Sequence, residues 1–211
     1  MPFTRIELAV LSIVAGGLAV LLGKREQVPH KGAWALPGGV LRIDLDADLE
    51  AAAKRVAEER LGVAPPFLRL LTAVGSKSRD PRAHWGLAIV YRALVPIDAF
   101  SPKAGKRLEE LRWASVDAAA EDSRLAFDHA RLIQGAALVT RAEIERLELP
   151  FDFLPERFTL GELQALCESM LGRRLDKSSF RRRLEERELL QAVPGEMRRG
   201  AFRPAQLYRR R

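Results

Sequence analysis

Residues 33–63 decide the fold, and they read AWALPGGVLRIDLDADLEAAAKRVAEERLGV. The first part is apolar and ends in Gly38 and Gly39, which permit positive φ and a close approach of the backbone to a ligand. An acidic loop follows, and then a helix is predicted from about residue 49 to residue 61, with Gly62 as its C-cap. The stretch therefore predicts a strand, a loop and a helix in succession.

This stretch resembles the Nudix box, a family pattern that, aligned on Gly62, places three glutamates at positions 56, 59 and 60. Positions 56, 59 and 60 are related as i, i+3 and i+4 and share a face, where three carboxylates would hold a divalent cation and polarise a pyrophosphate. This chain has Val56, Glu59 and Arg60 there. The Arg60 guanidinium cannot be deprotonated and would occupy the cation's place. We therefore expect no metal site and no hydrolysis. Glu59 is the one residual candidate for a catalytic role, and an ion pair with Arg55 or Arg60 is an equally good explanation for it. Glu58 lies off this face and is expected in solvent.

The composition indicates a soluble globular protein in a reducing compartment. Of the 211 residues, 47% are hydrophobic and 30% are charged, proportions that are ordinary for globular domains. The single cysteine, Cys167, excludes an internal disulfide, and its apolar neighbours predict a buried thiol. The apolar run of residues 6–22 contains Glu7 and is broken at Gly16 and Gly17, which indicates two strands joined by a tight turn. We expect a cytoplasmic protein that contacts no membrane.

Further along the first part of the chain, strands and helices are mixed in an order that suits an α+β sandwich. The loop at Arg79, Asp80 and Arg82 carries two permanent cations that are suitable for phosphate, although two solvated loop arginines fit the residue types as well. His129 is expected to act in capping or packing first and in ligand contact second. The predicted strands are residues 6–15, 18–24, 68–74, 85–95 and 103–116, and a helix is predicted for residues 125–147.

The character of the chain changes near residue 149. Thr159 and Glu162 form a predicted capping box, which begins a helix that Gly172 ends. A second helix is predicted to begin at Asp176, with Phe180 packing inward. A basic hairpin follows, and Pro194-Gly195 and Gly200 are expected at its turns.

Positive charge is concentrated in this last part. Residues 170–211 contain thirteen Lys and Arg against five Asp and Glu, which leaves a net charge of +8, whereas the whole chain carries +7. Two helices followed by a basic hairpin are typical of a winged helix-turn-helix, whose second helix enters the major groove of DNA. A basic, solvated face of a small helical domain is the alternative. The predicted DNA contacts are Lys177, Ser178, Ser179, Arg181 and Arg182 in the helix and Arg198, Arg199 and Arg203 in the wing.

The two halves together resemble the Nudix-related transcriptional regulators of the NrtR type. Aligned on Gly62, the Nudix box pattern places its arginine at Arg55, and the distance from Gly39 to Arg55 is two residues longer than the pattern. The resemblance covers nearly the whole chain. It continues in RDPR (residues 79–82), LAFDHA (125–130), LPERFTLGELQ (154–164), LDKSSFRRRL (175–184) and RPAQLYR (203–209).

The resemblance implies a Nudix α/β/α sandwich over residues 1–148, which senses an effector, and a winged helix-turn-helix over residues 149–211. It implies a dimeric repressor, often of NAD-biosynthesis genes, that binds a palindromic operator in double-stranded DNA and senses ADP-ribose or a related nucleotide. A protein of this kind requires no cofactor. It would require Mg²⁺ only if hydrolytic activity survives. The ligand-binding residues that we assign are Trp34, Gly38, Gly39, Arg42, Arg79, Asp80 and Arg82.

Two alternatives stay open at the level of sequence. The first is an active hydrolase of nucleoside diphosphate derivatives such as ADP-ribose or NADH, which Mg²⁺-dependent release of AMP would reveal. The second is a regulator that binds a sugar phosphate. The box cannot distinguish such a regulator from one that binds a nucleotide. The pair His84-Trp85 departs from the family pattern and bears on the identity of the effector.

Overall fold

The computed structural model describes residues 2–198 and 204–211. The chain forms two compact units, Met1–Leu138 and Val139–Arg211, and the division falls within the helix α3 (His129–Glu145). The domain boundary that the sequence predicts, between residues 148 and 149, stays a prediction. None of the helices in the described part of the chain combines the length and the apolar character needed to cross a membrane.

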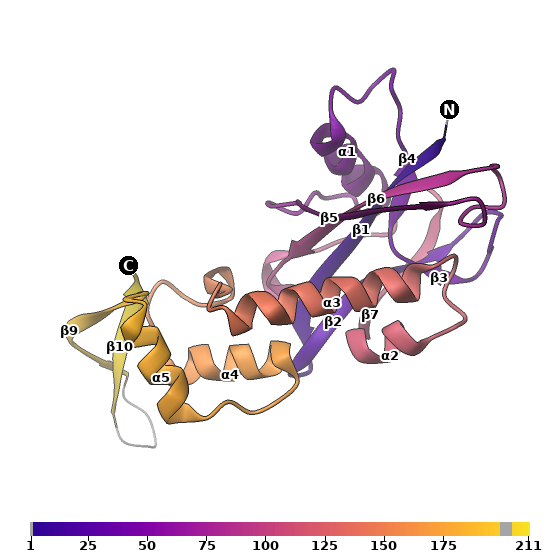
Figure 1. Ribbon diagram of the computed structural model, residues 1–211. Helices are drawn as coiled ribbons and strands as arrows, with labels where there is room; N and C mark the ends of the chain where they lie inside the picture. Colours follow the sequence, from indigo (N-terminus) through magenta and orange to yellow (C-terminus); the bar gives the residue numbers. More distant parts are fainter. Residues whose placement is uncertain (1, 199–203) are drawn as a thin grey trace. The chain divides into compact units, whose positions relative to one another are not determined.

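The first unit is built on a mixed β-sheet (Figure 1). Its strands are β1 (Phe3–Val14), β2 (Gly17–Arg25), β3 (Trp34–Ala35), β4 (Gly38–Val40), β5 (Arg69–Ser76), β6 (Gly86–Leu94) and β7 (Leu108–Ser115). Within the described residues these seven strands run in the order β3-β2-β1-β6-β5, while β4 also pairs with β1 and β7 with β2. Strand β1 pairs with β4 near its start and with β2 near its end, and it runs parallel to β6. Strand β1 therefore connects the strands that surround the candidate site described below.

Both faces of β1 are covered, because successive side chains point to opposite sides of a strand. Ile6, Leu8 and Val10 lie in the core beneath α1 (Leu49–Leu61). Arg5 and Glu7 are buried on the other face. Helix α1 lies on one side of the sheet, and α2 (Val116–Glu121) with the start of α3 lies on the other (Figure 1). Two charged side chains are thus enclosed on the face opposite α1.

Helix α1 has the predicted bounds because its ends are specified locally. The Asp48 side chain accepts a hydrogen bond from the Ala51 amide at 2.7 Å, and Gly62 ends the helix in the left-handed region at φ 70°. Ala52, Ala53 and Val56 are fully buried in the core of the first unit, and Glu58 is exposed as expected. The predicted strand-loop-helix unit is confirmed.

Three details of the first unit differ from the predictions. The turn between β1 and β2 consists of Ala15 and Gly16, both with positive φ (49° and 79°), and Gly17 already belongs to β2. The backbone twist of such a two-residue turn matches the twist of the two strands that it joins. Helix α2 was not predicted, since the sequence analysis ended the preceding strand at residue 116 and assigned no element to residues 117–124. Helix α3 begins at His129, four residues later than predicted, because Phe127 has φ 55°.

The second unit has the predicted helix pair and hairpin. Its elements after α3 are β8 (Phe158–Thr159), α4 (Leu160–Leu171), α5 (Lys177–Glu186), β9 (Leu190–Arg198) and β10 (Ala205–Arg210). Short 3₁₀ turns occur at Ile97–Ala99 in the first unit and Phe151–Phe153 in the second. Strands β8, β10 and β9 form a sheet in that order. Pro194 and Gly195 lie inside β9 and not at a turn, which corrects the prediction.

Local signals set the helices of the second unit. The Thr159 hydroxyl accepts from the Glu162 amide at 3.2 Å, while the Glu162 carboxylate accepts from the Thr159 amide at 2.7 Å, so the predicted capping box is present. Phe180 and Leu184 are buried one turn apart on α5. Cys167 is buried, and burial raises the pKa of its thiol to about 12. The thiol is therefore protonated and part of the core, as predicted.

Candidate anion-binding cleft and nucleic-acid interface

Five arginines line a small cleft in the first unit. Arg5 comes from β1, Arg25 from the end of β2, Arg60 from the last turn of α1, Arg82 from the loop before β6 and Arg107 from the residue before β7. Leu36, between β3 and β4, and Gly38, the first residue of β4, also line the cleft. Cations from five separate elements therefore converge on one space.

Carboxylates offset only part of this charge. The Arg5 Nε donates to Glu7 at 2.7 Å, the Arg82 Nε donates to Asp80 at 2.8 Å, and Arg60 lies 3.8 Å from Glu59. Five guanidinium groups against these three carboxylates leave a surplus of two positive charges. Guanidinium groups bind phosphate oxygens in a forked geometry. The cleft is thus suited to a dianionic phosphate group.

Glu7 is the buried anion at the base of the cleft. Both Glu7 and His129 are fully buried, and their nearest side-chain atoms are 3.8 Å apart. Burial alone would raise the pKa of Glu7, but the attraction of Arg5, together with His129, lowers this pKa to about 2. Glu7 is therefore ionised at neutral pH. A Cβ at Gly38 would lie 1.8 Å from Glu7 Oε2, so only glycine fits at that position.

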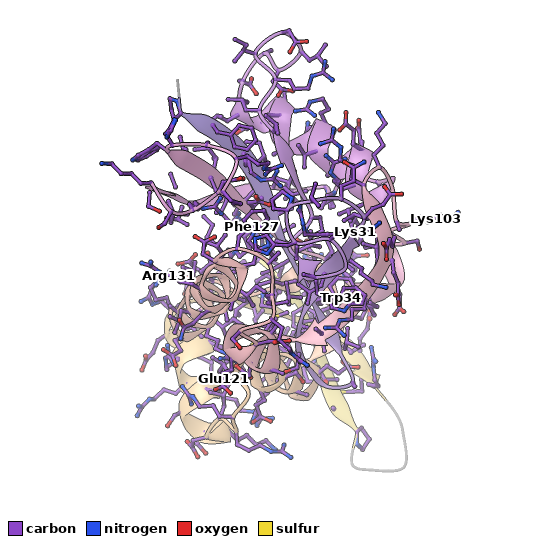
Figure 2. All side chains as sticks on the ribbon, turned by 90° about the vertical axis from the view of Figure 1, so that its right-hand side faces the viewer. Lys31, Trp34, Lys103, Glu121, Phe127 and Arg131 are labelled. Carbon is purple, nitrogen blue, oxygen red and sulfur yellow. The ribbon has the colours of Figure 1, made fainter. Side chains whose placement is uncertain are left out.

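The ring of Phe127 is surrounded by the cations of the cleft. It lies 5.0 Å from the guanidinium of Arg25, 5.8 Å from that of Arg5 and 6.0 Å from that of Arg82, and His30 meets it edge-on at 4.6 Å. Figure 2 shows Phe127 among the side chains of the first unit, apart from Trp34. A cation over an aromatic face is stabilised by about 0.5–2 kcal/mol. Phe127 therefore helps to hold mutually repelling arginines together.

Val56, Glu59 and Arg60 occupy one face of α1. Val56 is fully buried in the core. Glu59 pairs with Arg55 at 3.4 Å and lies 3.8 Å from Arg60 and 3.9 Å from Lys106. Within the described residues, no three His, Cys, Asp or Glu side chains come together as a metal site would require.

Arg60 lines the cleft in a fixed orientation. Its Nε donates to the carbonyl oxygen of Gly38 at 2.7 Å, and its Nη1 donates to that of Lys106 at 2.9 Å. The residue is only 6% exposed. Burial lowers the pKa of Arg60, as do the cations Arg107, Arg5 and Arg55, while Glu59 opposes them. An arginine nevertheless stays charged at neutral pH.

The structure brings two of the seven predicted ligand residues to the cleft lining, Gly38 and Arg82. Arg79 and Asp80 are buried behind it. Asp80 holds Arg82, and Arg79 lies 3.0 Å from Asp128, close enough for an ion pair but without hydrogen-bond alignment. These two residues therefore support the loop that presents Arg82, and a direct ligand contact for them stays a prediction.

Three predicted ligand residues lie elsewhere in the first unit. Trp34 points away from the cleft that its neighbour Ala35 lines, and Arg112 stacks over its ring at 4.0 Å. A Cβ at Gly39 would meet Val56 at 2.8 Å, so this glycine permits close packing against α1. Arg42 is exposed and pairs with Asp44 at 3.2 Å. The second glycine, the tryptophan and Arg42 thus have structural explanations that need no ligand.

The sequence analysis did not identify three of the five cleft arginines, Arg5, Arg25 and Arg107, or the carboxylate of Glu7 that pairs with Arg5. Arg5 and Glu7 could have been found, because two charges spaced by two in a mostly apolar strand share one face of it. Arg25 and Arg107 carry no comparable signal, since one ends a strand and the other lies in an irregular loop. Their convergence depends on the pairing of β2 with β7.

The predicted DNA-binding residues of α5 share an accessible surface in the second unit. Lys177, Ser178, Ser179, Arg181 and Arg182 are all exposed. Phe180 and Leu184 anchor the helix from the opposite face. Arg182 is 3.6 Å from Glu186, and both side chains are largely in solvent, so the pair is weak. The helix therefore presents cations that can pair with phosphates.

The predicted wing residues are only partly described. Arg198 donates to the carboxylate of Glu162 and, at 3.2 Å, to the carbonyl oxygen of Arg157. This arginine therefore also ties β9 to the start of α4. Arg199 and Arg203, together with Gly200, lie outside the described residues.

Comparison with known proteins identifies both units. Residues 4–135 match the NUDIX domain family, and residues 150–210 match the NrtR DNA-binding winged helix domain. The ADPR responsive transcriptional repressor NtrR of Acinetobacter baylyi is 35% identical over 208 residues, which cover 99% of this chain and 82% of that protein.

Solved structures agree with this assignment. Shewanella oneidensis NrtR in complex with a 27mer DNA has a TM-score of 0.78 and 32% identity, over 99% of this chain and 93% of that one. The NUDIX domain of the same protein in complex with ADP ribose has a TM-score of 0.59 and 29% identity, over 70% of this chain and 89% of that one. The predicted α+β architecture and the predicted resemblance are both confirmed. The chain belongs to the NrtR family of Nudix-related transcriptional regulators.

Proposed function

We propose that this protein is a DNA-binding transcriptional repressor that senses ADP-ribose. The observation that carries the proposal is the presence, in one chain, of a five-arginine cleft on a Nudix fold and an exposed cationic helix in an NrtR-type winged helix unit. The relative from Acinetobacter baylyi is an ADPR responsive repressor. The two units supply the two binding activities that such a protein needs.

The effector is proposed from charge and from relatedness. The diphosphate of ADP-ribose is dianionic at neutral pH, which matches the surplus of two positive charges in the cleft. The related NUDIX domain of Shewanella oneidensis NrtR binds ADP ribose. Because the cleft contains permanently charged guanidinium groups, effector binding needs no cofactor.

DNA is proposed to bind through α5 and the wing. The side chains at the start of α5 would reach base edges in the major groove, and the arginines around them would neutralise phosphates. We propose a homodimer that places two such helices on a palindromic operator, since half-sites mirror the symmetry of the protein. A repressor acts on the genome, which also favours the predicted cytoplasmic location.

Titration of ADP-ribose into the purified protein, followed by calorimetry, tests the effector. The variant Arg25→Gln should weaken binding by about 10-fold or more, because hydrogen bonds to charged groups contribute about 1.5–3 kcal/mol. Arg69→Gln removes an exposed arginine of β5 outside the cleft lining and should bind as the wild type does. Equal affinity of wild type and Arg25→Gln would show that the effector binds elsewhere.

A further inference from the structure

We propose that the guanidinium of Arg60 replaces the divalent metal of the Nudix helix and binds the diphosphate of the effector directly. Effector binding is then independent of metal. This inference rests on the proposed function and names the cation that serves it. It follows from a disagreement between the Nudix fold, which implies a metal on α1, and the residues that this chain places there.

A divalent cation does not fit the face of α1. Of the three positions, Val56 is fully buried in the core and offers no ligand. Glu59 is the remaining carboxylate, and three cations surround it within 3.9 Å, Arg55, Arg60 and Lys106. A metal placed at Glu59 would meet their repulsion and compete with permanent ion pairs. The same cations that exclude a metal already provide positive charge.

The fixed orientation of Arg60 leaves one nitrogen for a ligand. Nε and Nη1 are held by the carbonyl oxygens of Gly38 and Lys106. Nη2 donates to no acceptor in the described part of the chain, and it lies beside Gly39, 3.5 Å from where a Cβ would be. Arg60 lines the cleft, and its unpaired Nη2 is the nitrogen that would donate to a phosphate oxygen of the effector. A guanidinium held by two bonds before the ligand arrives loses little conformational freedom on binding.

The backbone around Arg60 also requires an arginine of this length. Gly38 belongs to β4, whereas Lys106 belongs to the loop before β7, and the same guanidinium bonds both. Gly105 packs so closely against α1 that a Cβ there would lie 2.3 Å from the carbonyl oxygen of Glu59. The loop that carries Arg107 is thereby held against the last turn of α1. Arg60 thus positions two walls of the cleft as well as lining it.

Calorimetric titration of ADP-ribose in EDTA and in millimolar Mg²⁺ tests the inference. Wild type should bind with the same affinity, within about threefold, under both conditions. Arg60→Gln keeps one side-chain donor and removes the charge, and it should lose about 10- to 100-fold in affinity whether or not Mg²⁺ is present. Arg60→Lys should lose less than Arg60→Gln, since it keeps the charge. Lys54→Gln, on the exposed side of the same helix, is the matched control and should bind as wild type does.

The outcomes separate this inference from the proposed function. Wild-type binding that requires Mg²⁺, or an Arg60→Gln variant that is folded by thermal melting and binds equally well, would overturn the role of Arg60 while leaving the effector correct. A parallel titration uses inorganic pyrophosphate. If pyrophosphate binds in EDTA and depends on Arg60 while ADP-ribose does not bind, Arg60 has the inferred role and the effector is another diphosphate. Failure of both probes to bind overturns both proposals.

Discussion

Arg5 and Glu7 show how single residues build this site. The pair occupies one face of a strand whose other residues are mostly apolar, and Glu7 is fully buried. A buried ion pair is weak support for stability as a whole, but removing one partner leaves the other charge uncompensated, which costs about 3–5 kcal/mol. Glu7 therefore keeps Arg5 in the cleft lining. Because Glu7 must stay ionised to do so, the stability of the fold depends on pH.

The variant Glu7→Gln should reveal that dependence. The folded-state pKa of Glu7 is lowered to about 2 from an ordinary value of 4.5. A group with a depressed pKa stabilises the fold above its unfolded pKa and loses this contribution as the pH falls through its folded pKa. Wild type should thus be more stable than Glu7→Gln at pH 7 by roughly 3 kcal/mol, and the difference should shrink between pH 5 and pH 2.

Urea unfolding at a series of pH values measures this difference directly. Each protein is unfolded at pH 7, 5, 4 and 3, and the free energies of unfolding are compared at the same pH, so that other carboxylates contribute equally to both proteins. A gap that stays constant down to pH 3 would show that Glu7 does not titrate in this range, and would contradict its assignment as the buried anion of the cleft.

At the scale of single residues, local sequence predicted only part of the site. Arg60 was identified because the Nudix box pattern, aligned on Gly62, puts it on the helix face of the missing metal ligands. Arg82 was identified in a polar loop. Arg107 could not be found, because its approach to the cleft depends on Gly105 packing against α1, a contact between residues far apart in the sequence. Trp34 was assigned to the ligand from its place in a motif, while its side chain packs under Arg112.

Among the elements, α1 and α4 were predicted closely, because their ends are set by residues beside them. Asp48 and Gly62 cap α1, and Thr159 with Glu162 caps α4. Helix α2 was missed since it has only six residues and the Ser115 side chain makes no capping hydrogen bond. The start of α3 was misplaced because the left-handed conformation of Phe127 is set by its packing among arginines and histidines.

Helix α5 carries the prediction for DNA. The variant Arg182→Ala should weaken binding to operator DNA by about 10-fold or more if the side chain reaches a base edge, since such contacts are worth about 1–3 kcal/mol. Its affinity for ADP-ribose should not change. Fluorescence anisotropy with labelled DNA measures the first quantity and calorimetry the second.

A matched control separates a specific contact from a loss of charge. Arg131→Ala also removes one exposed arginine, from α3 in the first unit, where the side chain lies at the edge of the view in Figure 2. It should leave DNA affinity within about twofold of wild type, because Arg131 is not among the predicted DNA contacts and a charge outside the contact surface is screened by salt. If both variants bind DNA as wild type does, α5 is not the recognition helix.

For the whole molecule, a repressor that responds to ADP-ribose must couple its two binding activities. Leu36 lines the cleft, and its amide donates to Nδ1 of His129 at 2.9 Å. His129 is the first residue of α3, a helix that contains residues of both compact units. A ligand that shifts the cleft wall would therefore act first on the start of α3. Such coupling must be reciprocal, so that DNA lowers the affinity for ADP-ribose by the same factor.

The central claim is that a sequence-specific DNA-binding protein responds to ADP-ribose. The most direct test is capture of sheared genomic DNA from the source organism by the full-length protein, at physiological salt, with and without ADP-ribose. The account predicts recovery of a few palindromic fragments and their loss when ADP-ribose is added. Uniform recovery of all fragments, abolished by a modest increase in salt and unaffected by ADP-ribose, would instead show a nonspecific electrostatic surface and would contradict the account.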